Sequence, residues 1–260
     1  MDKRSSSKMI NQSSSEAATL PDLTNPWLGI FFLCFFLLGE YESMVEYGPV
    51  IGILEAFWVC SFSMVLASFG CSAGRPNWVA TAMISVSTGH TLWIVDSFTL
   101  LFNGSRLGSL GVADYGGVDG VTLSSFLAVS HHLWFMAACA RHLRGVRTQL
   151  TLGHFASSYV WVSLVSLLTL WINPVKCVMY KGTCILANVN MALEWWGAEF
   201  CDFCHWYDRD RGGSGLARWL WSNFLYSGVF NGALFGLLWL AVNYKAERPE
   251  TARGEDKKKK

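Results

Sequence analysis

The chain alternates long apolar blocks with short polar segments, and this grouping is its main structural signal. One crossing of a bilayer needs about 20 mostly apolar residues in a helix, and each block is close to that length. The blocks are residues 27–45, 49–70, 78–102, 121–140, 155–173, 183–204 and 219–243. The pattern therefore predicts an all-α fold, a polytopic bundle of transmembrane helices with six to seven spans.

The number of spans depends on two blocks that carry acidic side chains. Glu40 and Glu42 weaken the first block, and five polar residues interrupt 183–204: Asn188, Asn190, Glu194, Glu199 and Asp202. If 183–204 spans, Lys and Arg divide evenly, with 10 on each side of the membrane. If it is re-entrant or interfacial, the division is 14 to 6, and the positive-inside bias places both termini in the cytosol. We therefore favour six spans plus one half-buried polar helix.

Polar tails flank the predicted membrane domain, residues 27–244. Residues 1–26 are rich in serine and are expected to be disordered, and residues 245–260 form a basic tail. Lys257 and Lys258 have the positions of a dilysine retrieval signal of the endoplasmic reticulum, a kind of address that receptors read in the cytosol. We therefore expect the endoplasmic reticulum or another endomembrane, with an ordinary basic tail as the alternative.

Composition narrows the expected partners. The formal net charge is +1, so nothing attracts the chain to nucleic acid in general, and the expected partner is the lipid bilayer. The chain has 13 Trp residues, and four of them lie at predicted segment ends: Trp27, Trp78, Trp171 and Trp219. Indole rings favour the membrane–water interface, so these positions support the membrane interpretation.

Ionisable side chains inside the apolar blocks mark the candidate site, because such groups are costly at bilayer depth and usually face a bundle interior. His90 and Asp96 lie in block 78–102, and His131 and His132 lie in the next block. Helix geometry points His90 and Asp96 in different directions, so we expect Asp96 to meet one histidine of the pair, the one that faces inward. Such a contact could relay a proton, bind a metal or orient a general base. The alternative is a polar clamp that holds helices together through hydrogen bonds.

Glu194 completes the candidate set. A helix over 183–204 would be polar on two faces, which requires protein or water around it, and Glu194 could then accept a proton or contact a lipid head group. The alternative is an interfacial helix whose acidic side chains point to water. The predicted catalytic residues are His90, Asp96, His131, His132 and Glu194. Three of them could serve as metal ligands, but no HxxxH or HExxH spacing supports this, so cofactor and metal content stay open.

Three classes of function remain compatible with this set. The leading hypothesis is an endomembrane enzyme that acts on a lipid or another apolar substrate through a buried His/Asp centre. The second is a proton- or ion-coupled transporter or channel, and the third is a non-catalytic subunit of a membrane complex. No GxSxG, Walker-type or dinucleotide-binding glycine motif occurs, which argues against the familiar soluble chemistries.

Two further patterns concern packing and redox state. Gly228, Gly232 and Gly236 share one helix face and predict a close approach of another helix, either internal or from a second protomer. Cys177 and Cys184 flank a loop that is luminal if the N-terminus is cytosolic, where a disulfide would persist. Two free thiols are the alternative.

Overall fold

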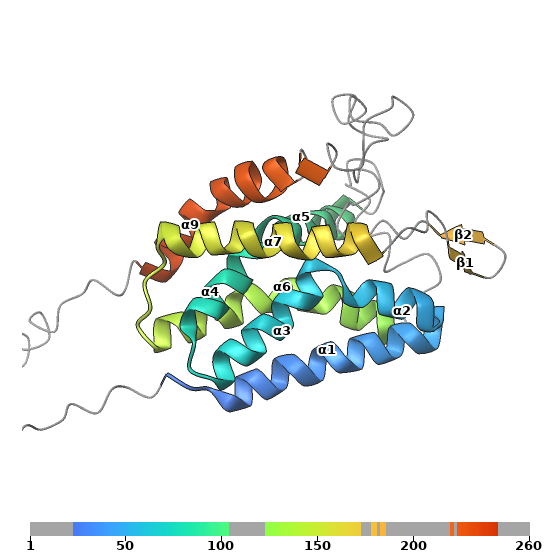
Figure 1. Ribbon diagram of the computed structural model, residues 1–260, viewed down its shortest axis with the longest axis horizontal. Coiled ribbons are helices and arrows are strands. Elements are labelled where there is room, and N and C mark those ends of the chain that lie inside the picture. The colour runs from blue at the N-terminus through green and yellow to red at the C-terminus, as the bar shows by residue number, and fades with distance from the viewer. Residues whose placement is uncertain are drawn as a thin grey trace, which may run out of the picture.

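The computed structural model describes residues 23–103, 123–172, 178–180, 183–185, 219–220 and 223–243. Its helices form a bundle that is elongated along one axis (Figure 1). They are α1 (Pro26–Tyr47), α2 (Pro49–Ala56), α3 (Val59–Ser72), α4 (Pro76–Ser85), α5 (Ser87–Asn103), α6 (Leu123–Gly145), α7 (Leu152–Ile172), the π-helical η5 (Phe224–Phe230) and α9 (Asn231–Asn243). The predicted helical class is confirmed. The exception is one short antiparallel hairpin of β1 (Val178–Tyr180) and β2 (Thr183–Ile185).

Within the described residues, three helical segments are long and apolar enough to cross a membrane: α1, residues 152–169 of α7, and residues 224–243 of η5 and α9. A fourth crossing results if α4 and α5 form one bent span. Block 49–70 is interrupted between α2 and α3, and α3 has only 14 residues. Helix α6 has 23 residues but is not among the helices apolar enough to cross, and most of block 183–204 lies outside the described residues. The apolar helices are compatible with a membrane-embedded protein, but six to seven spans are not confirmed.

Large apolar side chains cover much of the outer surface, as expected of helices that face lipid. Trp27 at the start of α1 and Trp171 at the end of α7 are 79% and 80% exposed, and Trp78 in the first turn of α4 is also exposed. These positions agree with the predicted placement of indole rings at segment ends.

The core lies between α1, α3, α4, α6 and α7. Helix α4 is the most enclosed element, since every residue from Val79 to Ser85 is buried. Its neighbours contribute Phe32 from α1 and Phe135 from α6, which are both fully buried and have ring centroids 5.2 Å apart.

Helices α1 and α3 approach closely because small residues line their contact. Asn25 accepts the Leu28 N–H at 3.1 Å and caps α1, while its own N–H donates to the Cys71 carbonyl at 2.8 Å. At Gly29 a Cβ atom would lie 2.7 Å from the Ser68 carbonyl oxygen, so only glycine allows this packing. The Ser68 hydroxyl donates to the Gly29 carbonyl at 2.7 Å and fixes the contact.

Helices α4 and α5 meet at a bend of 48°, and η5 and α9 satisfy the backbone groups that the bend releases. Asn231 Oδ1 accepts hydrogen bonds from the Thr88 N–H at 3.0 Å and from the Ser87 and Thr88 hydroxyls at 2.9 and 2.7 Å. Its Nδ2 donates to the Ser85 carbonyl at 3.2 Å, and the Gly89 N–H donates to the Tyr226 hydroxyl at 3.0 Å. A break inside an apolar bundle needs such partners, because unpaired backbone groups are costly there.

The glycine run on the last segment packs against aromatic rings of α7. The nearest atoms to a Cβ at Gly228 and at Gly232 belong to Tyr159 and Phe155, at 3.6 and 3.4 Å, whereas nothing lies within 4 Å at Gly236. An internal partner therefore covers two of the three glycines. An oligomer contact through this run stays a prediction.

The hairpin of β1 and β2 pairs Met179 with Cys184 and occupies the start of block 183–204. The sequence predicts a polar helix over that block, but its first three residues form a strand. Residues 186–204 lie outside the described part, as does Cys177. The helix beyond Ile185 and the Cys177–Cys184 bridge therefore stay predictions.

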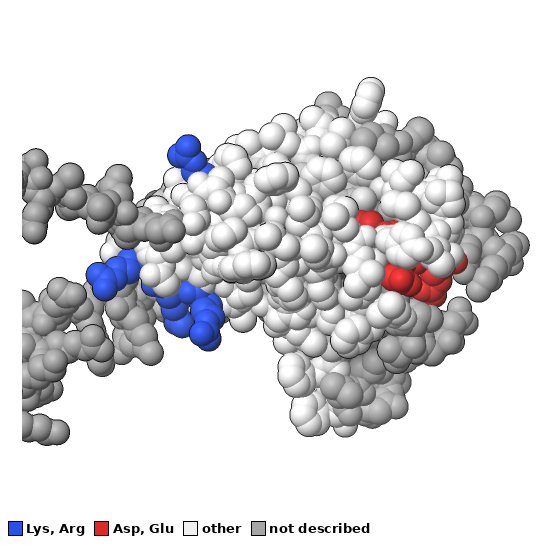
Figure 2. Space-filling model, turned by 90° about the horizontal axis from the view of Figure 1, so that it is seen from below, with Lys and Arg blue, Asp and Glu red and all other residues white. Residues whose placement is uncertain are grey.

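Charge is divided between the two ends of the bundle. The described arginines are all exposed and lie in the turn before α4 or at the end of α6 and the turn after it: Arg75, Arg141, Arg144 and Arg147. Figure 2 shows them at one end of the molecule and the acidic residues toward the other. The start of α1 and the end of α9 lie at the basic end (Figure 1).

Candidate functional site

Three histidines from two helices converge inside the bundle. His90 lies in the first turn of α5, and His131 and His132 lie in the middle of α6; all three are buried. The His90 ring centroid lies 5.4 Å from that of His131 and 4.6 Å from that of His132, and the centroids of the pair are 3.9 Å apart. We call these three residues the histidine cluster.

Aromatic side chains enclose the histidine cluster and hold its rings. Trp93, one turn after His90, stacks on His132 with centroids 4.7 Å apart and planes inclined by 26°. Phe135 lies edge-on to His90 at 5.7 Å, and Phe35 of α1 lies edge-on to His131 at 6.4 Å. Three different helices thus fix the imidazoles in apolar surroundings.

Most ring nitrogens of His90 and His131 have no hydrogen-bond partner. Only one of the four on His90 and His131 has a hydrogen bond: His131 Nδ1, 3.2 Å from the Leu127 carbonyl oxygen. Because a carbonyl only accepts, we assign the proton to Nδ1, which leaves a lone pair on Nε2. Buried polar groups without partners are rare in native proteins and usually indicate a role or a bound species.

The predicted clamp does exist, but other residues make it. Ser87 and Thr88 bond to Asn231, as described above, and neither ring nitrogen of His90 takes part. The clamp fixes the start of α5 and so places His90, two residues after Thr88. Ser87 and Thr88 therefore hold helices together, whereas His90, in the same polar run, is a candidate functional residue.

Cys60, in the first turn of α3, joins the cluster. One ligand atom each from Cys60, His131 and His132 lie within 4.8 Å of one another. A cysteine in an apolar run is usually a small packing residue, and the sequence predicts no more than that for Cys60. Its position in an apolar run gives no local signal, and only the tertiary fold brings it to the histidines.

The remaining predictions for the site concern the orientation of the His131–His132 pair and the contacts of Asp96 and Glu194. Both members of the His131–His132 pair are buried, so the expectation that only one faces inward was wrong. The reason is that α6 contacts α1, α4, α5 and α9, which enclose more than one of its faces. The Asp96 side chain and Glu194 lie outside the described residues, and their contact with the histidines stays a prediction.

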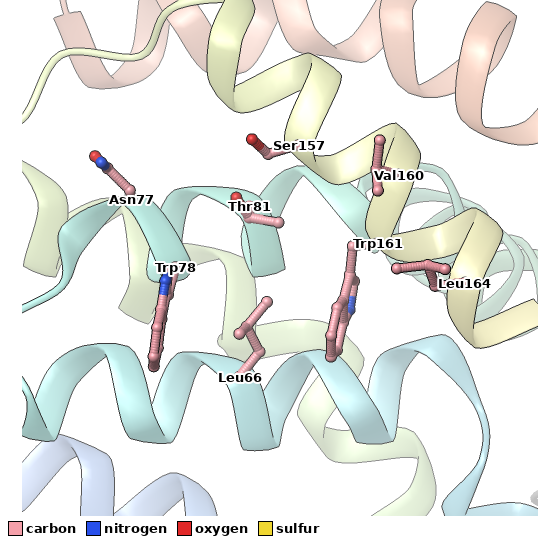
Figure 3. Close-up of a pocket in the computed structure, with 8 residues that line it drawn as sticks. All are labelled: Leu66, Asn77, Trp78, Thr81, Ser157, Val160, Trp161 and Leu164. Atoms are coloured by element: carbon pink, nitrogen blue, oxygen red, sulfur yellow. The ribbon is translucent and has the colours of Figure 1, made fainter.

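A separate pocket of about 330 Å³ lies between α3, α4 and α7 (Figure 3). The rings of Trp78 and Trp161 flank Leu66, and polar atoms come from Asn77, Thr81 and Ser157. His154 Nε2 lies 3.0 Å from Asn77 Oδ1, so α4 and α7 are linked at this side. The apolar lining suits a hydrocarbon chain, and the residues that line it do not include the histidine cluster.

Comparison with protein-family models, curated proteins and solved structures found no match for this chain. The class that the structure supports is therefore a helical protein with apolar helices compatible with membrane insertion.

Proposed function

We propose that the protein is an integral membrane enzyme that acts on a lipid or another apolar substrate, with the histidine cluster as its catalytic centre. The observation that carries this proposal is the convergence of three buried imidazoles, in which both ring nitrogens of His90 and Nε2 of His131 have no hydrogen bond. Ionisable groups placed at such cost inside an apolar bundle are typical of functional sites.

The geometry supports proton transfer by His131. Its Nε2 carries the free lone pair, while the Leu127 carbonyl holds the Nδ1 proton and orients the ring. A general base needs this arrangement, with one nitrogen fixed and the other open toward the reacting proton. In this proposal Asp96 and Glu194 are the acidic partners of the histidine cluster. The pocket beside Trp78 would hold an acyl chain.

Replacement of His131 by alanine is expected to abolish this activity. General acid–base groups contribute roughly 10²–10⁴-fold to a rate, so the variant should leave little turnover. Cells that lack the protein are complemented with wild-type or variant chains, and the lipids that change are measured by mass spectrometry. His131→Ala should reproduce the deletion profile.

His142→Ala is the matched control, because His142 is also buried on α6 but outside the cluster. It should restore the wild-type lipid profile. A wild-type profile from His131→Ala, at equal protein level, would reject the enzyme proposal.

A proton- or ion-coupled transporter is the second candidate, and the 48° bend between α4 and α5 favours it. Transporters place binding sites where helices are interrupted, and His90 lies in the first turn after this bend. A proton-dependent flux in liposomes that His131→Ala removes, with no change in any lipid, would select the transporter.

We also propose that the basic end of the bundle faces the cytosol and that the protein resides in the endoplasmic reticulum or another endomembrane. The four exposed arginines lie at the end where α1 begins and α9 ends (Figures 1 and 2). Positive residues flank membrane helices on the cytosolic side, so six crossings with both termini cytosolic fit best.

Tags at the two ends of the chain should both be accessible to antibody after the plasma membrane alone is permeabilised. A tag inserted within residues 104–122 should be reached only after full permeabilisation. Protection of the C-terminal tag would reject the six-crossing topology.

A further inference from the structure

Cys60, His131 and His132 have the composition and spacing of a metal site. Their ligand atoms lie within 4.8 Å of one another. In a tetrahedral Zn²⁺ site, neighbouring sulfur and nitrogen ligands are about 3.3–3.6 Å apart, so side-chain movements of about 1 Å would close the cluster. A thiol and two imidazoles match borderline-soft transition metals and not Mg²⁺ or Ca²⁺, which prefer oxygen ligands.

His90 gives an independent indication of a missing partner. It is 1% exposed, and neither of its ring nitrogens has a hydrogen bond. Its ring lies against both His131 and His132. A neutral imidazole carries one donor and one acceptor, so this burial leaves two polar atoms unpaired unless something else binds them.

The hydrogen bond between His131 and the backbone is also typical of a histidine that binds a metal. Histidines that bind metals usually donate their second ring N–H to a carbonyl or carboxylate, which sets the tautomer and the ring direction. Here the Leu127 carbonyl, 3.2 Å from Nδ1, leaves Nε2 available as the ligand atom.

Charge balance favours the same conclusion. A cation buried in an apolar bundle needs nearby negative charge, because its desolvation is otherwise too costly. Cys60 would supply one charge as a thiolate, because a bound ion displaces the thiol proton. That charge neutralises Cu⁺ and half of the charge of Zn²⁺.

We propose that Cys60, His131 and His132 bind one soft or borderline-soft transition metal ion, Cu⁺ or Zn²⁺, and that His90 occupies or faces the fourth position. This inference goes beyond the proposed enzyme, since the ion would bind whether or not the site turns over a lipid. With an ion on His131 Nε2, that nitrogen could not also accept a proton, and the role of base in the proposed enzyme would pass to His90, whose ring nitrogens have no hydrogen bond. When His90 leaves the fourth position, an open coordination site results, as in catalytic metal centres.

The test measures metal and not activity. The full chain is purified in detergent after growth with added Zn²⁺, and in parallel after loading with Cu⁺ under reductant. Bound metal is then counted by mass spectrometry, and competition with chelators gives the affinity. Co²⁺ loading adds a spectroscopic readout, because a thiolate ligand produces a charge-transfer band that Cys60→Ser would remove.

Wild-type protein should hold about one ion per chain, and the arm that retains it identifies Zn²⁺ or Cu⁺. Cys60→Ser and His131→Ala should weaken binding by at least about 100-fold, since even residues that only support a ligand are worth 10–100-fold. The controls Cys71→Ser and His142→Ala change buried residues on the same two helices and should retain the ion.

Two results would overturn the inference: wild-type protein without stoichiometric Zn²⁺ or Cu⁺ in either arm, or equal losses in the controls. Failure of the enzyme proposal looks different. In that case the ion is retained by wild-type protein and lost from His131→Ala, while the lipid profile of that variant stays normal.

Discussion

Asn231→Ala is expected to lower the free energy of unfolding by roughly 3–5 kcal/mol. The side chain is fully buried and makes four hydrogen bonds, to Ser85, Ser87 and Thr88, across the bend between α4 and α5. Each group left unpaired in an apolar interior costs about 1–3 kcal/mol, although partial rearrangement reduces the sum. The loss is measured by denaturation of the purified protein in mixed detergent micelles.

Asn243→Ala is the matched control, because it removes a second buried asparagine from the same helix. Asn243 makes two hydrogen bonds with Leu150, accepting from its N–H at 2.9 Å and donating to its carbonyl at 3.2 Å. We expect a loss of about 1–2 kcal/mol, near half that of Asn231→Ala. Equal effects of the two substitutions would show that the bend does not depend on Asn231.

The positions of several helices could be predicted from the sequence, because a long apolar block indicates a helix in apolar surroundings. Block 27–45 corresponds to α1, and residues 224–243 of block 219–243 correspond to η5 and α9. The same pattern could not show where a block breaks. Nothing in the hydropathy of residues 78–102 predicts the bend before Ser87, because it depends on partners, Asn231 and Tyr226, more than 130 residues away.

The candidate site was predictable only in part, for a similar reason. An imidazole is costly to bury, so a single histidine in an apolar block already indicates a special role. His90, His131 and His132 could therefore be identified as candidates from the sequence. A cysteine carries no such cost and is a common packing residue, so Cys60 could not be distinguished from Cys71 or Cys139. Its proposed role depends on the tertiary fold, which places the start of α3 beside the histidines of α6.

The polar run at the start of α5 contains both the clamp residues and the candidate site residue His90, so variants at neighbouring positions test different properties. Ser87 and Thr88 sit beside His90 in sequence, yet their partners belong to the last helical segment. Substitutions at these residues are expected to act on stability first and on the site only through the position of α5. His131, whose Nε2 has no partner, separates function from stability better.

Phe135→Ala is expected to destabilise the bundle by roughly 2–3 kcal/mol and to loosen the histidine cluster. Phe135 is fully buried and joins Phe32 of α1 to His90 of α5, at centroid distances of 5.2 and 5.7 Å. In soluble cores Phe→Ala costs about 3–5 kcal/mol, from lost transfer free energy plus the cavity. In lipid the first part shrinks, because the unfolded reference is also apolar, while the cavity and lost dispersion contacts remain.

Phe135→Leu should cost less than Phe135→Ala, and Phe69→Ala should have little effect, since Phe69 is 55% exposed on α3. Unfolding in detergent gives the order of the three variants. A larger loss at Phe69 than at Phe135 would mean that the apolar exterior, and not the contact between α1, α5 and α6, stabilises the bundle. Because the Phe135 ring lies edge-on to His90, Phe135→Ala should also impair the site more than Phe135→Leu does, whereas a purely structural cavity would leave the site unchanged.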